Sequence, residues 1–379
     1  MMYQDTLYGT FKVPDFIEEL AATPYLQRLH RVSQDTLPMF MVAHPTPSRF
    51  EHSMGVMRLG MEILKHNPDL LGDQKLILAS ALLHDAGNPP FSHLAEPFLK
   101  QLTGKDGESF LACMPENSEA AKVLASLKLS LTEVVRLVTG ETKPLATFLN
   151  GTLDIDNLDN VNRYRHASNG EIRFDGLRIA SGFRFEGQRW KLPIEILSEC
   201  QKWQQAREVV YGSIYANPHL AVCMMLYRAV DLAFQHGELS IDFFRMDDTQ
   251  ALAHLSGCNL QTAYLIQQLM AKKHYIELGS FETTEPSPKL RDRAKRINAR
   301  REIADEFAKQ INAPPELVCA YIGAGRDRRK IELPFVSSDG AYLLDNGKHP
   351  TIYRARLYVA PELEHFRLRA ERFLAELIA

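Results

Sequence analysis

The segment Leu76–Glu96 reads LILASALLHDAGNPPFSHLAE and holds both the strongest fold signal and the first candidate functional residues. Its first eight residues are apolar on nearly every side, which predicts a buried helix. His84 and Asp85 follow at the inner end of this helix, where two ionisable side chains are costly to bury unless they are paired or bind a metal. Gly87 and the prolines after Asn88 predict that the helix ends there in a turn.

A second pair of polar residues follows the turn. His93 and Glu96 stand three residues apart on what we predict to be a new helix, so their side chains share a face and can hydrogen-bond. An imidazole held by a carboxylate is typical of a general acid or base. For His84 alone, capping of its own helix with Asp85 solvated in the turn is an equally good interpretation. The second pair favours a functional site.

Composition sets the class of protein. The chain has 379 residues, 45% of them hydrophobic and 24% charged, which is ordinary for a soluble globular protein of one or two domains. We find no apolar run of the roughly 18 residues that a membrane span needs and no signal-peptide core, so we expect a cytoplasmic protein without a membrane partner. The net charge of −3 gives no overall attraction to nucleic acid. Five scattered cysteines without a CxxC pair predict free thiols.

A second candidate histidine lies on another predicted helix, which begins near Phe50 after the proline-rich segment AHPTPS (43–48). His52 stands four residues before Val56 on the apolar face of that helix. A lone histidine in such a place is more often a core residue than a ligand. Two histidines on neighbouring buried helices, one of them next to an aspartate, favour a metal site.

Carboxylates concentrate once more in LDIDNLDNVNRYRH (153–166). We interpret Asp154 as a helix N-cap and the pair Asp159–Arg163 as a surface ion pair that contributes only tenths of a kcal/mol. Three aspartates within six residues exceed what capping requires, so Asp156 is left as the candidate for a cation.

Four candidate ligands therefore stand at the ends of predicted helices: His52, His84, Asp85 and Asp156. Two imidazoles and two carboxylates suit manganese, iron, nickel, cobalt or zinc, with magnesium as a further possibility, better than calcium, which prefers all-oxygen ligands. Such a set leaves coordination positions open for water and a substrate oxygen, as hydrolysis requires. We predict a divalent metal ion as the cofactor.

The C-terminal part has a different composition from about residue 240. Residues 289–312 predict one basic helix, with Arg293, Arg296 and Arg300 on one face, and a second basic cluster follows at 326–330. These clusters either bind phosphate or an acidic partner, or they form a solvated charged face. Nucleic-acid binding has little support because aromatic residues are not interleaved with the basic ones.

Other parts of the chain give simpler predictions. Residues 170–192 alternate in the manner of a β-hairpin, with a helix and a loop as the alternative for part of this range, and 193–237 are helical. Tyr211 and Tyr215 lie four apart in this helical region, and we interpret them as core aromatics, with ligand contact as the alternative. We expect a mainly α fold with a core over residues 1–240 and a helical and mixed α/β extension over residues 241–379.

The ordered motifs resemble a known family. RFEHS (49–53), His84-Asp85 and Asp156 within IDNLDN resemble the H…HD…D signature of HD-domain metal phosphohydrolases. The surrounding YGTFKVP, TPYLQRLHRVSQ, SRFEHSMGV and LLHDAGNPPFSH resemble its deoxynucleoside triphosphate triphosphohydrolase branch, over roughly residues 5 to 235. The resemblance implies an HD-domain helical core with a small α+β C-terminal appendage.

The resemblance also implies roles for single residues. In that branch, water attacks the α-phosphorus of a deoxynucleoside triphosphate and releases triphosphate and nucleoside. Carried over, the metal ligands are His52, His84, Asp85 and Asp156; His93 and Glu96 assist proton transfer at the phosphate; Gln34 contacts the sugar and Arg49 the phosphate.

Four positions depart from the pattern of the branch. Asn88 stands where the branch has the second histidine of HDxGH, and Gly107-Glu108 stands where a His-Glu pair is common. Asn160 replaces a tyrosine that packs on the sugar, which makes Asn160 a candidate substrate contact. Asp35 replaces an apolar residue. These changes leave the predicted ligands intact and alter their surroundings.

Two classes of function follow from these observations. The first is an enzyme that hydrolyses a nucleotide, with a deoxynucleoside triphosphate as the first candidate and a nucleoside monophosphate or another phosphoester as variants. The second is a regulatory module that binds a nucleotide with little turnover. The resemblance further implies a homo-oligomer.

Overall fold

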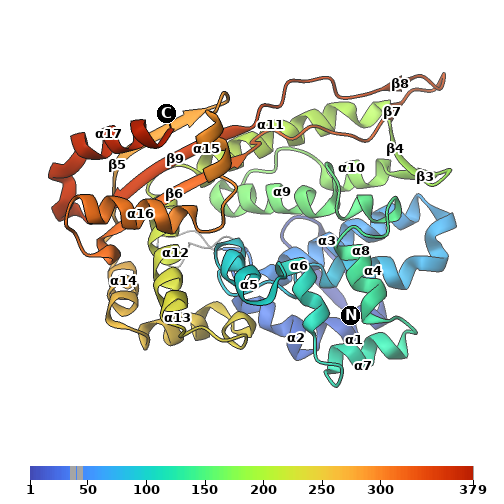
Figure 1. The fold of residues 1–379 in the computed structure, drawn as a ribbon. Helices are drawn as coiled ribbons and strands as arrows, with labels where there is room; N and C mark the ends of the chain where they lie inside the picture. The colour runs from blue at the N-terminus through green and yellow to red at the C-terminus, as the bar shows by residue number, and fades with distance from the viewer. Residues whose placement is uncertain (35–39, 41–45, 379) are drawn as a thin grey trace.

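Helices make up most of the structure, a computed structural model that describes residues 1–34, 40 and 46–378 (Figure 1). Three small sheets accompany them. The prediction of a mainly α fold is confirmed. The helices up to residue 214 are α1 (Asp15–Ala21), α2 (Pro24–Gln27), α3 (Arg49–Lys65), α4 (Gln74–Leu83), α5 (Glu96–Thr103), α6 (Gly107–Phe110), α7 (Glu119–Ser126), α8 (Leu131–Val138), α9 (Ile155–Asn169), α10 (Gly176–Gly182) and α11 (Leu197–Ile214).

Helix α4 is the buried helix predicted from the apolar run, and every residue from Ile77 to Leu83 is buried in it. It packs against α3, whose start is fixed by a capping box. The Ser48 hydroxyl accepts from the Glu51 backbone N–H, and the Ser48 backbone N–H donates to the Glu51 carboxylate. Residues 46–48 precede α3 without helix, as predicted, whereas 43–45 lie outside the described residues.

Helix α9 packs against both α3 and α11. Asp154 is its N-cap, as predicted, since the carboxylate accepts from the Asn157 backbone N–H at 2.7 Å. Gly170 ends the helix with φ of 73° in the left-handed region that favours glycine. The ends of α3, α4 and α9 thereby meet at one place in the core.

Two hairpins and one long-range pairing complete this half. β1 (Met2–Asp5) pairs with β2 (Gly9–Lys12), and β3 (Arg184–Glu186) pairs with β4 (Arg189–Pro193). Within 170–192 the hairpin occupies the second part, and the first part contains α10, in agreement with the alternative of a helix and a loop for part of this range. β4 also pairs in parallel with β7 (Phe335–Val336), which pairs with β8 (Tyr342–Leu343).

The C-terminal half is built around a three-stranded antiparallel sheet in the order β5 (Ile276–Thr283), β9 (Ile352–Val359), β6 (Val318–Gly325), at the orange and red end of Figure 1. One helix packs against β6 and another against β5. The helices of this half are α12 (His219–Gln235), α13 (Asp248–Ser256), α14 (Leu260–Met270), α15 (Pro288–Arg293), α16 (Ala299–Gln310, on β6) and α17 (Arg367–Ile378, on β5).

The prediction of one basic helix over 289–312 is wrong, because two helices, α15 and α16, occupy this range. Leu290 and Ala299 are both buried in the core beside the sheet. Nine residues make about two and a half helical turns, so a continuous helix would point these side chains to opposite sides. The break at 294–298 lets both face the core.

The predicted boundary near residue 240 stays a prediction, since packing crosses it. Ile331, Leu333 and Phe335 are buried in the core of α3, α4 and α9. In the described part of the chain, no single helix is long and apolar enough to cross a membrane. One helix pair, bent by 62° between Ile194–Ile214 and His219–Gln235, meets the length and composition criteria together. All five cysteines are free thiols, as predicted.

Candidate active site

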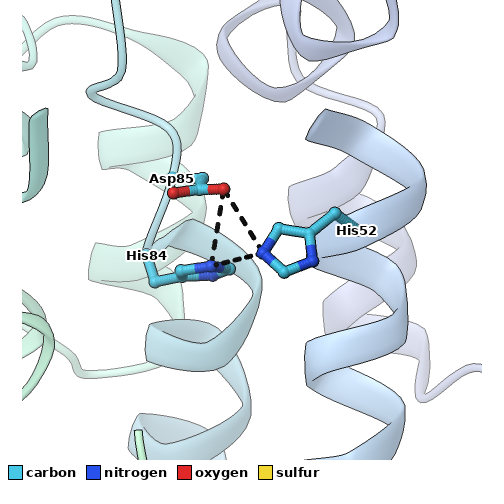
Figure 2. Close-up of side chains that lie close together, drawn as sticks. All are labelled: His52, His84 and Asp85. Carbon is cyan, nitrogen blue, oxygen red and sulfur yellow. Dashed lines mark hydrogen bonds and ion pairs between the residues drawn. The ribbon is translucent and has the colours of Figure 1, made fainter. Parts of the chain in front are cut away.

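Three predicted ligands converge where α3 and α4 meet, as Figure 2 shows. His52 projects from the first turn of α3, while His84 and Asp85 follow the last residue of α4. The two Nε2 atoms lie 3.2 Å apart, and each lies 3.5 Å from Oδ2 of Asp85. These three residues are buried, and each offers one ligand atom within 4.8 Å of the others.

The fourth predicted ligand comes from the first turn of α9. Oδ1 of Asp156 lies 3.0 Å from Nε2 of His52 and 3.8 Å from Nε2 of His84. The side chain of Asp156 is 32% exposed, in contrast to its three neighbours. The cluster is therefore buried at His52, His84 and Asp85 and partly exposed to solvent at Asp156.

The charges around the cluster favour the protonated form of the His84 imidazole and the ionised form of the Asp85 carboxylate. Burial alone would lower the pKa of His84, but the carboxylates of Asp85 and Asp156 raise it to about 9. Burial would raise the pKa of Asp85, but Arg49 and His84 hold it below its ordinary value. Two imidazoles and two carboxylates in such a field are consistent with a bound divalent metal ion of mixed nitrogen and oxygen preference.

His84 also satisfies the capping interpretation. Its Nδ1 lies 2.9 Å from the carbonyl oxygen of Ala81 at the end of α4. This bond places the proton on Nδ1 and leaves Nε2 free to face the cluster. The two interpretations offered for His84 thus describe its two nitrogens, and they are compatible.

The prediction that Asp159 and Arg163 form a surface ion pair is wrong. Both are buried, and Asp159 lies 2.7 Å from Nδ1 of His52. Arg163 donates to both carboxylate oxygens of Asp159, at 2.7 and 2.8 Å, and to Asp5 at 3.0 Å. This chain orients His52 from behind, in the manner of an outer-shell carboxylate at a metal site.

A sequence signal for this arrangement was available at Gly55. A Cβ atom at Gly55 would lie 2.0 Å from the Asp159 carboxylate, so only glycine allows α9 to approach α3 here. Gly55 stands three residues after His52, on the same helical face. A glycine inside a long helix, on the face of a candidate ligand, indicates a close neighbour.

Both oxygens of Asp85, including the Oδ2 that faces the two imidazoles, accept hydrogen bonds from protein groups. Nη1 of Arg49 donates to Oδ2 at 2.5 Å, and Nε of Arg49 donates to the Ser92 hydroxyl at 2.9 Å. Nδ2 of Asn88 donates to Oδ1 at 2.6 Å. Arg49 is buried in these contacts, so the structure gives it a role beside Asp85, while contact with phosphate stays a prediction.

Two of the departures noted in the sequence lie in contact with each other. A Cβ at position 107 would come within 1.8 Å of the Asn88 side-chain oxygen. The space that a side chain would need at Gly107 is thus taken by Asn88. The absence of a histidine at both positions is therefore one change of packing rather than two independent ones.

His93 and Glu96 are paired as predicted, with Nδ1 of His93 3.1 Å from the Glu96 carboxylate. They do not share one helix, because His93 lies in the short 3-10 helix Ser92–Leu94 and Glu96 begins α5. Glu96 also accepts from the Gly107 backbone N–H at 2.8 Å. The hydrogen bond to Glu96 raises the pKa of His93, whose side chain is 71% exposed.

A cavity of about 290 Å³ lies beside the cluster. Asn157, which follows Asp156 in α9, is in its wall. Both polar atoms of the Gln34 amide are buried there without a hydrogen-bond partner among the described residues, which suits recognition of a polar ligand. Asp35 lies outside the described residues. Three residues predicted to act on substrate line the cavity: Gln34, His93 and Asn160.

Tyr211 and Tyr215 also line this cavity, and both pack against the hydrophobic core, so core packing and ligand contact both stay predictions. Both are only partly buried. Arg207 lies over the ring of Tyr211 at 4.0 Å, and Arg354 lies over the ring of Tyr215 at 4.1 Å. Their spacing of four residues identified the shared face of α11 but not what that face meets, since the partner elements come from the far end of the chain.

Comparisons with known proteins agree with this geometry. The HD domain family matches residues 49–161, a range that includes all four residues of the cluster. The chain is 26% identical over 292 residues to Uncharacterized protein MJ1154 of Methanocaldococcus jannaschii, covering 75% of this chain and 61% of that protein. It is 35% identical over 107 residues to the deoxynucleoside triphosphate triphosphohydrolase SAMHD1 homolog of Dictyostelium discoideum, covering 26% of this chain and 21% of that protein.

Two solved structures share the fold. A hypothetical protein from Aquifex aeolicus superposes with a TM-score of 0.76 and 21% identity, covering 99% of each chain. A phosphohydrolase from Bacteroides thetaiotaomicron superposes with a TM-score of 0.71 and 18% identity, covering 95% of this chain and 99% of that one. Residues 49–161 thus match the HD domain family, and the fold of the chain is that of these two structures.

Proposed function

We propose that this protein hydrolyses a phosphoester of a nucleotide, with a deoxynucleoside triphosphate as the first candidate. The observation that carries the proposal is the position of the His/Asp cluster beside a cavity that is lined by aromatic rings and by an amide with no hydrogen-bond partner among the described residues. The cavity volume of about 290 Å³ is close to the lower limit for small-molecule sites, which suits a nucleoside.

Four residues would hold the divalent ion: His52, His84, Asp85 and Asp156. When bound, such an ion polarises a phosphoryl oxygen and lowers the pKa of water. Asp159 fixes the ring of His52, while Arg49 and Asn88 fix the carboxylate of Asp85. These contacts keep the ligand atoms in place.

His93 is the candidate proton carrier. Glu96 binds its Nδ1, so Nε2 is the nitrogen that can exchange a proton with a leaving oxygen in the cavity. The Gln34 amide, whose donor and acceptor have no partner among the described residues, is suited to a sugar hydroxyl. Asn160, in place of a tyrosine, offers a hydrogen bond where the related branch offers a ring.

The choice of a deoxynucleoside triphosphate draws its support from the matched segment of the SAMHD1 homolog, whose name gives that activity. The changes at Asn88, Gly107 and Asn160 favour the alternative of a module that holds a nucleotide with little turnover. We propose hydrolysis because the cluster and the His93–Glu96 pair are both present.

A nucleotide panel tests this function. The protein is loaded with manganese, iron, nickel, cobalt, zinc or magnesium, and release of phosphate, pyrophosphate and triphosphate is measured for deoxynucleoside and ribonucleoside mono-, di- and triphosphates. We expect turnover with at least one nucleotide and its loss in His84→Ala. Tight nucleotide binding with no product under any metal would favour the regulatory module instead.

His236→Ala is the matched control for His84→Ala. Nδ1 of His236 lies 2.8 Å from the Leu232 carbonyl oxygen at the end of α12, the same capping contact that His84 makes on α4. His236 has no part in the cluster. Equal loss of activity in both variants would show that capping, and not the cluster, limits function.

The predicted homo-oligomer and cytoplasmic location belong to the same proposal, and both come from the sequence. Light scattering coupled to size-exclusion chromatography, with and without nucleotide, measures the oligomeric state. Fractionation of the source cells measures location.

A further inference from the structure

A second cavity, of about 710 Å³, adjoins the substrate cavity. Its walls come from α5, the break between α15 and α16, and β6. The two cavities share Tyr215, Arg300 and Tyr321 in their linings. Arg300 thus faces both the cavity beside the His/Asp cluster and the larger space next to it.

Arg300 has an unusual set of contacts for a partly buried arginine. Its guanidinium carbon lies 4.9 Å from the ring centroid of Tyr227 and 4.8 Å from that of Tyr321. Its Nε donates to the Ile322 carbonyl at 3.4 Å. Within residues 1–34, 40 and 46–378, no carboxylate lies within ion-pair distance of Arg300. Two aromatic faces therefore fix a planar cation whose charge is not neutralised.

The other basic residues of the second cavity add to this charge. Lys295 is exposed and forms no ion pair with any described residue, whereas Arg296 is paired with Glu302. Lys100 lies 3.8 Å from Asp106, a weak pair.

The lining also includes two carboxylates. That of Asp106 faces Lys100, and that of Glu96 is bound to His93 and to a backbone N–H. After these pairings, Arg300 and Lys295 remain as positive groups without a counter-charge.

We propose that the substrate carries a second phosphate group, at its end away from the metal cluster, and that Arg300 binds it. This inference rests on the proposed function. The lining of the substrate cavity includes Asn157, next to the predicted ligand Asp156, and Arg300, which it shares with the second cavity. A guanidinium offers two parallel N–H donors that match phosphate oxygens, and stacking on aromatic rings leaves that edge free.

The aromatic walls define the rest of the ligand. The rings of Tyr211, Tyr215 and Tyr321 form a tilted series with centroid distances of 6.3 and 5.7 Å, and all three line the substrate cavity. Aromatic rings can stack on a nucleobase. The substrate class that fits is a nucleotide with a phosphate at both ends of its sugar, as in a nucleoside 3′,5′-bisphosphate.

Binding of uncleavable analogues tests this inference without turnover. Two 5′-phosphonate analogues of one deoxynucleoside, with and without a 3′-phosphate, are titrated calorimetrically into the manganese-loaded protein. We expect the 3′-phosphorylated analogue to bind at least about tenfold more tightly, because a charge-assisted hydrogen bond is gained. Arg300→Gln should remove this difference between the two analogues.

Two further variants sharpen the result. Arg293→Gln is the control, because Arg293 lies just before the same break, pairs with Glu306 at 3.6 Å and lines neither cavity. It should retain the full difference. Lys295→Gln, at an exposed position where folding is not at risk, should reduce the difference in part.

Several outcomes would overturn the inference. Equal affinities for the two analogues in the unaltered protein would show that the protein does not bind a second phosphate group. An equal loss of both affinities in Arg300→Gln would show that Arg300 only shapes the cavity. Independent binding of inorganic phosphate alongside the plain analogue would assign the subsite to a separate anion.

The inference and the proposed function fail in different ways. If neither analogue binds, the nucleotide is wrong and both proposals fall. Discrimination between the analogues without hydrolysis of any nucleotide would support the inference and favour the regulatory module.

Discussion

Asp159 lies 2.7 Å from Nδ1 of His52, and this single contact determines which nitrogen of His52 faces the cluster. Burial would raise the pKa of Asp159, but the guanidinium of Arg163 outweighs burial and holds it below its ordinary value. Asp159 is therefore a carboxylate that accepts, the proton of His52 lies on Nδ1, and Nε2 is left as a ligand.

The first prediction concerns Asp159→Asn. An amide oxygen can still accept from His52, but the negative charge that strengthens the ligand is lost, and Arg163 keeps only Asp5 as a buried counter-charge. We expect metal affinity to fall by about 10- to 100-fold. The free energy of unfolding should fall by about 3 kcal/mol. Metal titration and urea denaturation measure the two effects separately.

Asp231→Asn is the matched control for that variant. Asp231 is as fully buried as Asp159 and accepts from two arginines, Arg228 at 3.0 Å and Arg301 at 2.6 Å. It lies in α12, outside the cluster. It should lose comparable stability with no change in metal affinity. Equal metal loss in both variants would show that general destabilisation, and not the orientation of His52, weakens the site.

The second prediction concerns metal removal. A metal that binds the folded chain and not the unfolded one stabilises it by about 2.7 kcal/mol when its free concentration is 100 times the dissociation constant. We therefore expect chelation to lower the melting temperature, and His52→Ala to abolish the effect of chelation. Differential scanning calorimetry with and without a chelator measures this. The same chelator-induced shift in His52→Ala would place the metal elsewhere.

Much of this arrangement was predictable because it depends on local pattern. The uniformly apolar run before His84 identified a buried helix, and the position of two ionisable residues at its end identified a site. Asp154 was predictable as a cap because capping depends on residues at most three apart. Ordered motifs linked His52 and Asp156 to the same site through the family resemblance.

The features that sequence analysis missed depend on contacts between distant segments. Asp159 was taken for a surface residue because its partner Arg163 is local, whereas its burial comes from the approach of α9 to α3 at Gly55. Nothing in α11 shows that residues near 300 and 321 line the same cavity as Tyr211, because they come from the far end of the chain. The parallel pairing of Leu192 with Phe335 likewise joins segments whose separation in sequence hides it.

The third prediction concerns the pH dependence of catalysis. The Glu96 carboxylate stabilises the imidazolium of His93, which raises the pKa of His93 above its ordinary value. If His93 donates a proton to the leaving oxygen, activity falls as pH rises through that pKa. Glu96→Gln removes the negative charge and lowers the pKa of His93, so the falling limb of the profile should move to lower pH.

Rates measured from about pH 5 to pH 9, across the range where histidine titrates, test this shift. Glu285→Gln is the control, because Glu285 is exposed and lines neither cavity. A shift of the rising limb in place of the falling one would make His93 a base. If the pH profile of the rate is the same in Glu96→Gln as in the unaltered protein, His93 takes no part in proton transfer.

The fourth prediction concerns the contact between Asn88 and Gly107. Gly107→Ala should destabilise the fold by about 1–3 kcal/mol, because the added Cβ would lie 1.8 Å from the Asn88 side-chain oxygen and force it to move. Asn88→Ala should cost a similar amount, about 1–3 kcal/mol, because Oδ1 of Asp85 loses a buried donor.

In the double variant the space for the new methyl group is already free, so its cost should be smaller than the sum of the two single costs by about 1 kcal/mol or more. Equilibrium denaturation of all four proteins gives this coupling energy, and metal affinity measured on the same proteins shows whether a displaced Asn88 disturbs Asp85. Additive costs would mean that Gly107 is required for its bond to Glu96 and not for the space it leaves to Asn88.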